Sequence, residues 1–252
     1  MSSQHFVLTG ATSGVGLSLL KLLLQQKVRV TVLVRSPQKL TALKSKDEDN
    51  LLQIIECDLL NMDDINGLHQ YFQNTTITGL IYSAGMGYFK SISDHNVQEI
   101  TDTYNLNVVH FNLLFKVLQP HLATKATIVG IGSQASHITQ AYAAHYGASK
   151  AAFNQLLNAL RLEHPNYHVM VVNTGPIDTA FHQKADPSLT YAQKYQSIML
   201  DADTLAKDII NGIIWKKTEI NKPYWMNVLL KFYNLAPRTF ERLLPKLFKN
   251  KQ

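Results

Sequence analysis

The sequence predicts a doubly wound α/β fold, in which helices cover both faces of a parallel β-sheet. Short runs of β-branched and other apolar residues alternate with longer stretches of helical character over most of the chain. The chain has 252 residues, of which 46% are apolar, so it can bury the core of one large domain. Strands that alternate with helices in this way imply parallel pairing with right-handed crossovers.

The predicted elements begin with the apolar strand His5–Thr9, which leads through glycines into the leucine-rich helix Leu17–Leu24. Val28–Val34 is β-branched and ends at a polar turn, which predicts the second strand. Later strands are expected at Leu51–Cys57, Ile77–Ser83, Ala126–Ile131 and Tyr167–Asn173. The remaining helices are expected at Gln38–Lys46, Met62–Phe72, Val97–Leu122, Tyr142–Leu162 and Thr204–Trp215.

Charge divides the chain into a neutral body and a basic tail. The net charge is +6, and residues 222–252 contain seven basic side chains against one acidic side chain, so residues 1–221 are balanced. A neutral body gives no indication of nucleic-acid binding. We therefore expect one domain over residues 1–221, with an insertion at about residues 180–202, and a basic tail over residues 222–252.

Residue usage excludes several classes of protein. The single cysteine, Cys57, rules out an internal disulfide and any cysteine-based zinc site. The ten histidines show none of the zinc-binding spacings, so no metal site is expected. The sequence has neither the apolar core of a signal peptide nor a run of about 18 apolar residues that could span a bilayer. We expect a cytoplasmic protein, with peripheral membrane contact left open.

A glycine-rich string, Thr9-Gly10-Ala11-Thr12-Ser13-Gly14-Val15-Gly16, follows the first predicted strand. At a turn from a strand into a helix, glycines let a phosphate approach the backbone, and the helix N-terminus supplies unpaired amides. The spacing is Gly-x-x-x-Gly-x-Gly rather than Gly-x-Gly-x-x-Gly. Its position after the first strand nevertheless predicts a nucleotide-binding loop.

The end of the second strand indicates which dinucleotide is bound. An acidic residue there binds the ribose 2′-hydroxyl of NAD(H), whereas a basic residue accommodates the 2′-phosphate of NADP(H). Arg35 occupies this position, with Ser36 beside it and no acid nearby. The alternative is a solvated arginine at a strand end, but the charge favours NADP(H) over NAD(H).

Three proton-handling side chains are spaced so that they can meet at one carbonyl oxygen. Tyr146 and Lys150 lie four residues apart in a predicted helix, which puts them on one face about one turn apart. Ser133 precedes Tyr146 by thirteen residues, just after a predicted strand. A neighbouring ammonium lowers the pKa of a phenol from its ordinary value of about 10. Each residue alone is more often a packed or solvated side chain, but together they predict acid–base chemistry on a carbonyl or an alcohol.

With the glycine-rich loop and these three residues, the chain resembles the short-chain dehydrogenase/reductase family, in its short, single-domain form, over about residues 4–215. Asn107, thirteen residues before Pro120, is similar to the helix asparagine of the family's proton relay. Three loops also resemble the family: Asp58-Leu59, Ser83-Ala84-Gly85 and Asn173-Thr174-Gly175-Pro176-Ile177-Asp178-Thr179. Ser83 replaces the family's asparagine and Thr174 its proline, and both changes bear on cofactor affinity.

The resemblance implies a Rossmann-type fold and an NAD(P)-dependent oxidoreductase that acts on a carbonyl compound or the corresponding alcohol. It implies that Tyr146 is the general acid in reduction and the base in oxidation, and that Ser133 orients the carbonyl oxygen. Lys150 is implied to lower the phenol pKa and to hold the nicotinamide ribose, and Asn107 to hold a water that links Lys150 to solvent. The residues implied to bind the cofactor are Gly10, Thr12, Ser13, Gly14, Val15, Gly16, Arg35, Ser36, Asp58, Leu59, Ser83, Ala84, Gly85, Tyr146, Lys150, Gly175, Pro176, Ile177 and Thr179.

The family's usual subunit interface implies a homodimer or homotetramer built on the helices at residues 97–122 and 142–162. The insertion at residues 180–202 stands where the family carries its substrate lid. Its apolar residues either line a pocket for an apolar or extended carbonyl substrate or anchor a rigid helix against the core. These residues are Phe181, Leu189, Tyr191, Tyr195, Ile198 and Met199. His145 and His182 either face the substrate or are packed or solvated.

The basic tail carries an apolar stripe. Tyr224–Leu235 is mostly apolar, and a second set recurs at helical spacing around a break expected at Pro245. This second set is Phe240, Leu243, Leu244, Leu247 and Phe248. The stripe either lies on an anionic membrane surface or packs against the body or a second subunit.

Two other functions stay open. A non-catalytic NADP-binding regulatory or membrane-associated protein needs only the nucleotide pocket, so the joint presence of Ser133, Tyr146 and Lys150 disfavours it. An epimerase or dehydratase of the family's extended form needs a larger C-terminal substrate domain than the residues after Trp215 provide.

Overall fold

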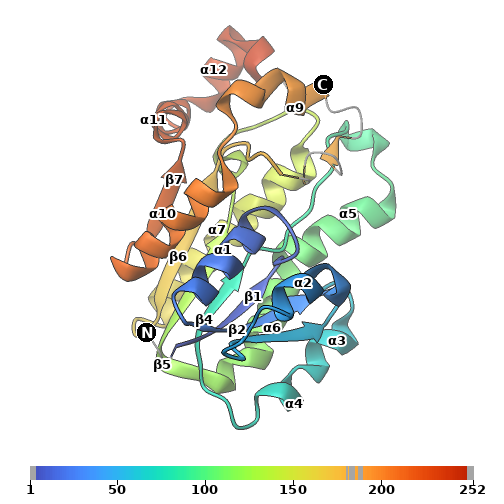
Figure 1. Cartoon of the computed structure of the whole chain (residues 1–252). Helices are drawn as coiled ribbons and strands as arrows, with labels where there is room; N and C mark the ends of the chain where they lie inside the picture. The colour runs from blue at the N-terminus through green and yellow to red at the C-terminus, as the bar shows by residue number, and fades with distance from the viewer. Residues whose placement is uncertain (1–3, 180, 182–184, 187–189, 249–252) are drawn as a thin grey trace.

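The computed structural model describes residues 4–179, 181, 185–186 and 190–248 (Figure 1). Seven parallel strands form one sheet in the order β3-β2-β1-β4-β5-β6-β7, which confirms the predicted doubly wound fold. The strands are β1 His5–Thr9, β2 Arg29–Val34, β3 Leu52–Glu56, β4 Ile77–Tyr82, β5 Leu122–Ile131, β6 His168–Thr174 and β7 Glu219–Lys222. The strand order reverses on either side of β1, so the carboxyl ends of β1 and β4 border the crevice where such folds bind nucleotides.

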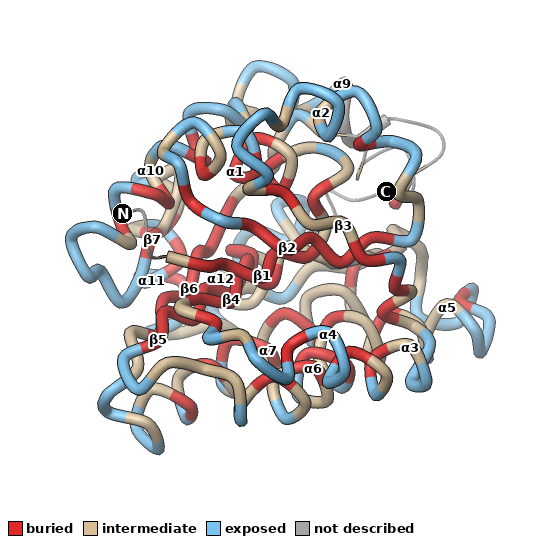
Figure 2. The backbone as a smooth tube through the Cα atoms, turned by 60° about the horizontal axis from the view of Figure 1, so that its bottom comes forward, coloured by how far each residue is buried: buried red, intermediate tan, exposed pale blue. Residues whose placement is uncertain are grey.

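Helices cover both faces of the sheet, as Figure 2 shows. The described α-helices are α1 Gly14–Gln25, α2 Thr41–Lys44, α3 Met62–Gly67, α4 His69–Phe72, α5 Val97–Tyr104, α6 His110–Leu118, α7 Ala144–Glu163, α9 Thr190–Tyr195, α10 Ala202–Ile214, α11 Tyr224–Tyr233 and α12 Pro237–Leu243. One apolar core lies between the sheet and the pair α1 and α10, and the other lies between the sheet and α3, α4, α6 and α7. The helices of these two layers exclude water from both faces of the sheet, as is usual for a parallel sheet.

Several boundaries differ from the sequence prediction. The helix expected at Gln38–Lys46 is a 3-10 turn, η1 Pro37–Leu40, followed by the short α2, and the helix expected at Met62–Phe72 is divided at Leu68 into α3 and α4. The helix expected at Val97–Leu122 is α5 and α6 joined by a π-helical turn, η3 Asn105–Val109, and β5 begins at Leu122. Local propensity does not reveal such breaks, because side-chain packing decides them.

The seventh strand, β7, was absent from the sequence prediction. Its residues, Glu219-Ile220-Asn221-Lys222, form no apolar run, and Ile220 alone is buried. The strand exists because β6 offers an unpaired edge, with which it pairs in the register Val171↔Glu219 to Thr174↔Lys222. Tertiary pairing thus overrides a weak local preference.

The C-terminal segment packs on the body of the molecule. Leu230 and Tyr233 of α11 are buried, and the Tyr233 hydroxyl donates to Glu241 Oε1 at 2.7 Å and lies 3.0 Å from Thr139 Oγ1. The amide of Ala141 donates to the backbone oxygen of Phe248 at 2.8 Å. The break expected at Pro245 separates α12 from η7 Pro245–Phe248.

Within the part of the chain that the structure describes, every helix is too short or too polar to cross a lipid bilayer.

Candidate active site

A cavity of about 840 Å³ lies along the carboxyl edge of the sheet and extends to the C-terminal helices. Nearly all residues predicted to form the site line it: Gly10, Thr12, Ser13, Gly14, Val15, Gly16, Arg35, Ser36, Asp58, Leu59, Ser83, Ala84, Gly85, Ser133, Tyr146, Lys150, Gly175, Pro176, Ile177 and Thr179. Asn107 lies behind the cavity wall rather than on it, and its neighbour Leu106 is exposed to the cavity. The fold therefore collects on one edge residues that are up to about 170 positions apart in the chain.

The glycine-rich loop has the shape of a cradle for a phosphate group. Gly10 has φ of +68°, and a Cβ atom there would lie 2.8 Å from the carbonyl carbon of Ser83, so only glycine fits between the ends of β1 and β4. The Thr9 hydroxyl joins the same two ends, because it accepts hydrogen bonds from the amides of Ser83 and Ala84, both at 3.0 Å. Ser13 precedes α1 without a capping side-chain bond, which leaves the first amides of α1 for an anionic ligand.

Two cations line the cavity beside the end of β2. Arg35 follows β2 and is exposed, and Lys39 lies one turn later in η1. Lys39 was not predicted as a site residue, because it lies beyond the strand end, where the charge of Arg35 indicates the cofactor. A charged side chain one helical turn beyond Ser36 is the pattern that could have revealed it.

Ser133 is fixed at the end of β5, where the chain turns into η5 Gln134–His137. Its hydroxyl oxygen accepts from the amide of Ala135 at 3.1 Å, and the hydroxyl donates weakly to the backbone oxygen of Thr174 at 3.4 Å. The residue is 7% exposed and lines the cavity. The serine is thus oriented by the backbone of two neighbouring strand ends.

Tyr146 lies in the first turn of α7 and faces the cavity. Its ring packs against those of Phe89 and Phe181, with centroid separations of 6.3 Å and 5.4 Å. Gly87 leaves room for this ring, since a Cβ atom there would lie 2.5 Å from Tyr146 Cδ2. Burial raises the pKa of the Tyr146 phenol, and a hydrogen bond with Ser133 lowers it by a smaller amount.

The raised pKa of the Tyr146 phenol differs from the expectation that Lys150 lowers it. Lys150 is itself buried, and loss of hydration lowers the pKa of its ammonium to about 8. The Nζ atom donates to the backbone oxygen of Ile131 at 2.9 Å, which holds the side chain against the end of β5. The physical reason for the difference is desolvation, because burial disfavours the charged form of both the phenol and the ammonium.

Asn107 connects the cavity wall to α7. Its Nδ2 donates to the backbone oxygen of Met86 at 2.7 Å and to Ser149 Oγ at 2.9 Å, and its Oδ1 accepts from the Met86 amide at 3.0 Å. A Cβ atom at Gly85 would lie 3.0 Å from Lys150 Nζ and 3.3 Å from Asn107 Oδ1. Lys150 Nζ and Asn107 Oδ1 therefore both lie close to Gly85, on the side where a Cβ atom would stand.

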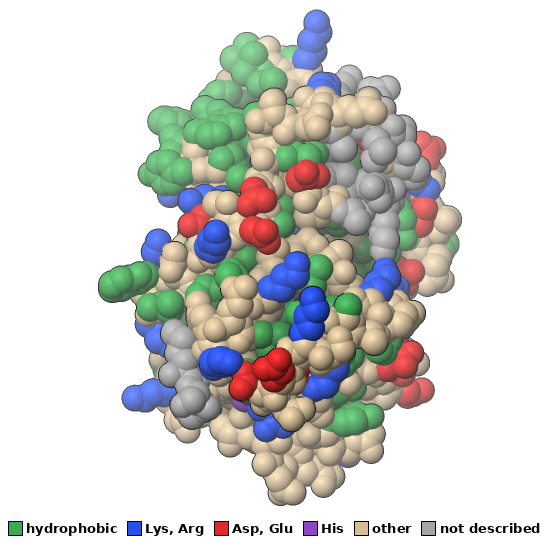
Figure 3. All heavy atoms as spheres, viewed as in Figure 1, with side chains coloured by type: hydrophobic (Ala, Val, Ile, Leu, Met, Phe, Trp, Pro, Cys, Tyr) green, Lys and Arg blue, Asp and Glu red, His purple; other side chains and the backbone are tan. Residues whose placement is uncertain are grey.

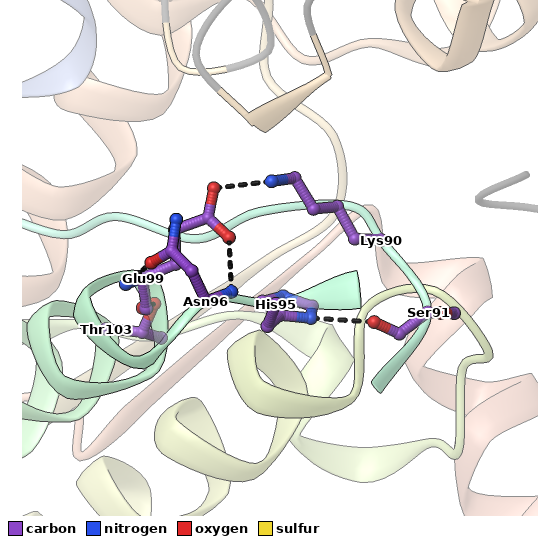
Figure 4. Close-up of polar contacts among 6 residues, drawn as sticks. All are labelled: Lys90, Ser91, His95, Asn96, Glu99 and Thr103. Atoms are coloured by element: carbon purple, nitrogen blue, oxygen red, sulfur yellow. Dashed lines mark hydrogen bonds and ion pairs between the residues drawn. The ribbon is translucent and has the colours of Figure 1, made fainter. Parts of the chain in front are cut away.

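The loop after β4 is anchored by polar contacts, which Figure 4 shows. Lys90 pairs with Glu99 at 2.5 Å, Glu99 and Asn96 form a capping box at the start of α5, and His95 Nδ1 lies 2.8 Å from the backbone oxygen of Ser91. Tyr88 and Phe89, in the same loop, line the cavity. The anchored loop thereby holds two aromatic side chains on the cavity wall, and one of them, Phe89, packs against Tyr146.

His145 does not face the cavity. Its ring lies 4.7 Å from that of His95, and its Nδ1 is 3.4 Å from the hydroxyl of Tyr104. Of the insertion residues expected to contact a substrate, Phe181, Tyr195 and Ile198 line the cavity and Met199 does not. Leu189, His182 and the side chain of Tyr191 lie outside the described residues.

The far wall of the cavity consists of apolar side chains from the C-terminal helices, none of which was predicted as part of the site. They are Trp225, Met226, Leu229, Leu230, Phe232, Tyr233, Phe240, Leu244, Leu247 and Phe248. The approach of α11 to the site begins at Pro223, whose backbone oxygen accepts from Gln134 Nε2 at 3.1 Å. A Cβ atom at Gly175 would lie 2.9 Å from Pro223 Cδ, so the loop after β6 touches the start of α11.

Comparison with known protein families gives a match over residues 4–189 to the family described as short chain dehydrogenase. The chain belongs to the short-chain dehydrogenase/reductase family. Members of this family are oxidoreductases that use a nicotinamide cofactor, so the protein is an NAD(P)-dependent dehydrogenase or reductase.

Three relatives illustrate the range of this short-chain dehydrogenase/reductase family. A probable short-chain type dehydrogenase/reductase, VdlC, of Helicobacter pylori is 30% identical over 219 residues, which are 83% of this chain and 77% of that protein. The 3-dehydrosphinganine reductase TSC10A of Arabidopsis thaliana is 27% identical, over 84% of this chain and 69% of its own length. An NADPH-dependent 1-acyldihydroxyacetone phosphate reductase of Schizosaccharomyces pombe is 28% identical, over 76% of this chain and 66% of its own length.

Solved structures show the same fold at low sequence identity. A short-chain dehydrogenase from Sphingobium yanoikuyae in complex with NADPH has a TM-score of 0.79 and 20% identity, with 95% of each chain covered. A short-chain dehydrogenase/reductase from Burkholderia phymatum in complex with NAD has a TM-score of 0.81 and 15% identity, with 94% of this chain and 95% of that chain covered. The two complexes contain different cofactors, so fold likeness alone does not distinguish NAD from NADP.

Proposed function

We propose that the protein is an NADP(H)-dependent oxidoreductase that reduces a carbonyl group on an apolar, extended substrate, or oxidises the corresponding alcohol. The observation that carries this proposal is the convergence of Ser133, Tyr146 and Lys150 on one cavity that also contains the glycine-rich loop. The cradle at Gly10, the uncapped start of α1 and the cations at Arg35 and Lys39 fit a dinucleotide with an additional phosphate.

The reaction follows from the chemistry of these side chains. NADP(H), when bound, supplies the hydride for reduction or accepts it in oxidation. Negative charge develops on the carbonyl oxygen during reduction, and Tyr146 donates the proton that completes the alcohol. Ser133, held by the amide of Ala135, hydrogen-bonds the same oxygen and orients it. In the reverse direction Tyr146 accepts the proton.

Lys150 and Asn107 return the proton to Tyr146. The ammonium of Lys150 has a pKa of about 8, which is close to neutral and therefore suits proton exchange. Asn107 lies beside Gly85 as Lys150 does, and its side-chain nitrogen and oxygen both bond to the backbone of Met86. We assign to Asn107 the fixing of a water molecule between Lys150 and bulk solvent.

The apolar far wall of the cavity supports an apolar substrate. Two of the relatives are named for the reduction of 3-dehydrosphinganine and of 1-acyldihydroxyacetone phosphate, compounds that join a ketone to an apolar chain. In this chain Phe181, Leu229 and Leu244 are suited to contact such a chain while Tyr146 contacts the carbonyl oxygen.

Replacement of Tyr146 by phenylalanine tests the proposed reaction. We expect kcat to fall by about 100-fold or more, because positioned acid catalysis contributes at least this factor. The measurement is NADPH consumption with a panel of ketones, aldehydes, quinones and acyl thioesters. Tyr104→Phe is the matched control, since Tyr104 does not line the cavity. A Tyr146→Phe variant that keeps more than about a tenth of the wild-type kcat excludes the acid role.

Replacement of Arg35 by alanine tests the cofactor preference. A guanidinium that binds the 2′-phosphate makes a charge-assisted contact, so kcat/KM for NADPH should fall by about tenfold or more while the value for NADH changes little. Arg29→Ala, at the opposite end of β2, is the control. A wild-type protein with equal or higher kcat/KM for NADH contradicts the preference for NADP(H).

A further inference from the structure

The C-terminal helices expose an unusual amount of apolar surface. Among the described residues, sixteen large apolar side chains are exposed, and eight of them lie within residues 224–247. We call these eight the C-terminal apolar face; Leu235 is 80% exposed, Tyr224 72% and Leu243 69%. The eight are Tyr224, Trp225, Leu229, Phe232, Leu235, Leu243, Leu244 and Leu247. Figure 3 shows apolar side chains gathered over α11 and α12 at one end of the molecule. Apolar patches of this kind mark surfaces that bind a membrane or another molecule.

Half of the face belongs to α11, which is held firmly against the body. Asn227, Leu230 and Tyr233 form the buried side of α11, and the Asn234 side chain donates to the backbone oxygen of His137 at 2.9 Å. Trp225, Leu229 and Phe232, at i, i+4 and i+7, form the adjacent side. The helix therefore has two apolar sides, one for the body and one that the described residues leave exposed.

Basic side chains are interspersed among the residues of this face along the chain. Lys231, Arg242 and Lys246 are exposed and form no ion pair with any described residue. Lys222 pairs with Asp208, and Arg238 pairs with Glu241. Because the body of the chain is neutral, the whole net charge of +6 belongs to the segment that carries the face.

We propose that the C-terminal apolar face docks on the surface of an anionic lipid bilayer. Tryptophan, phenylalanine and leucine on one side of a helix, with lysine and arginine beside them, are the composition of interfacial helices. Anionic lipids attract each such basic residue near the surface. A second copy of the chain fits less well, since a two-fold symmetric contact would bring the same positive charges together.

The face is continuous with the cavity that contains Tyr146. Trp225, Leu229 and Phe232 belong to the face and also line the cavity, as do Leu244 and Leu247. A docked molecule would thus turn the apolar end of its cavity toward the lipid. This last step rests on the proposed function, in which an apolar carbonyl compound enters from the bilayer and reaches Tyr146 without crossing water.

Co-sedimentation of the full chain with lipid vesicles, without cofactor or substrate, tests the docking surface independently of the proposed reaction. We expect binding to phosphatidylcholine vesicles that contain about 30% phosphatidylserine, and at least about tenfold weaker binding to phosphatidylcholine alone. Raising the salt from about 0.1 M to about 1 M shortens the Debye length from about 10 Å to about 3 Å and should release the protein. Absence of binding to the anionic vesicles overturns the proposal.

Matched variants locate the surface. Tyr224→Ser, Leu235→Ser and Leu243→Ser together remove exposed apolar groups that do not line the cavity, and we expect at least about tenfold weaker vesicle binding. The control combines Met62→Ser, Ile214→Ser and Trp215→Ser, which are exposed elsewhere, and should bind as wild type does. Circular dichroism checks that both variants are folded. Equal vesicle binding by the two variants overturns the proposal. The proposal is also overturned if the wild-type protein is a dimer that does not bind vesicles and if the first set of substitutions makes it a monomer.

Discussion

Burial gives Lys150 an ionisation unlike that of an ordinary lysine. Its Nζ lies within the protein, donates to the backbone oxygen of Ile131 and sits 5.5 Å from the ring centre of Phe153. These contacts replace only part of the water that a free ammonium would bind, so the pKa falls to about 8. The sequence spacing to Tyr146 correctly indicates that the two side chains share one face of a helix, but spacing carries no information about desolvation.

The pH dependence of stability follows from this lowered pKa. Lys150 keeps its proton up to a pH of about 10.5 in the unfolded chain but releases it near pH 8 in the folded protein, so the unfolded state binds more protons between these values. The free energy of unfolding should therefore rise with pH in this window, by up to about 3 kcal/mol relative to a Lys150→Met variant. Urea denaturation at several pH values measures the difference.

The exposed lysine Lys21 provides the control for this experiment. A Lys21→Met variant should run parallel to wild type across the same pH window. If the Lys150→Met curve also runs parallel to wild type between about pH 8 and 10.5, then Lys150 keeps an ordinary pKa in the folded state.

At the scale of elements, the π-helical turn η3 determines where Asn107 points. A continuous helix over residues 97–122 would place each side chain at the regular interval of 3.6 residues per turn. The wider turn between α5 and α6 instead directs Asn107 inward, where it is 1% exposed and bonded to Met86 and Ser149. Single π-helical turns occur frequently at functional sites.

Replacement of Asn107 by alanine should destabilise the protein by about 2 to 3 kcal/mol. The change removes three hydrogen bonds, two of which satisfy the amide and the carbonyl of Met86. Asn112→Ala is a matched control, because Asn112 is exposed and bonds only to the backbone oxygen of Val108 among the described residues. Chemical denaturation of both variants measures the effect, and equal free energies of unfolding would show that the Asn107 contacts contribute nothing.

At the scale of the whole molecule, the sequence predicts those features that arise from local patterns repeated along the chain. Apolar strands and amphipathic helices alternate with a strong period, so the sheet, its two covering layers and the ligand-binding edge follow from the pattern. The strand β7 and the seating of α11 against the cavity do not follow, because they depend on contacts with β6 and Gly175 that no local pattern encodes. The residues of the far wall, such as Leu229 and Leu244, were therefore missed as part of the site.

The assembly of body and C-terminal helices predicts how the enzyme distinguishes substrates by length. The proposed catalytic side chains come from the body and the far wall from α11, α12 and η7, so a longer apolar chain should bury more surface on the far wall. Each methylene buried contributes about 0.8 kcal/mol, which corresponds to a rise in kcat/KM of up to about fourfold. A series of methyl ketones from butanone to undecanone, assayed with NADPH in the absence of lipid, measures this increment. Leu244→Ser should reduce it, whereas Leu243→Ser, whose side chain is exposed and does not line the cavity, should leave it unchanged. If kcat/KM does not rise with chain length in the wild type, or rises equally in the two variants, then the C-terminal helices do not bind the substrate and act only through their outer surface.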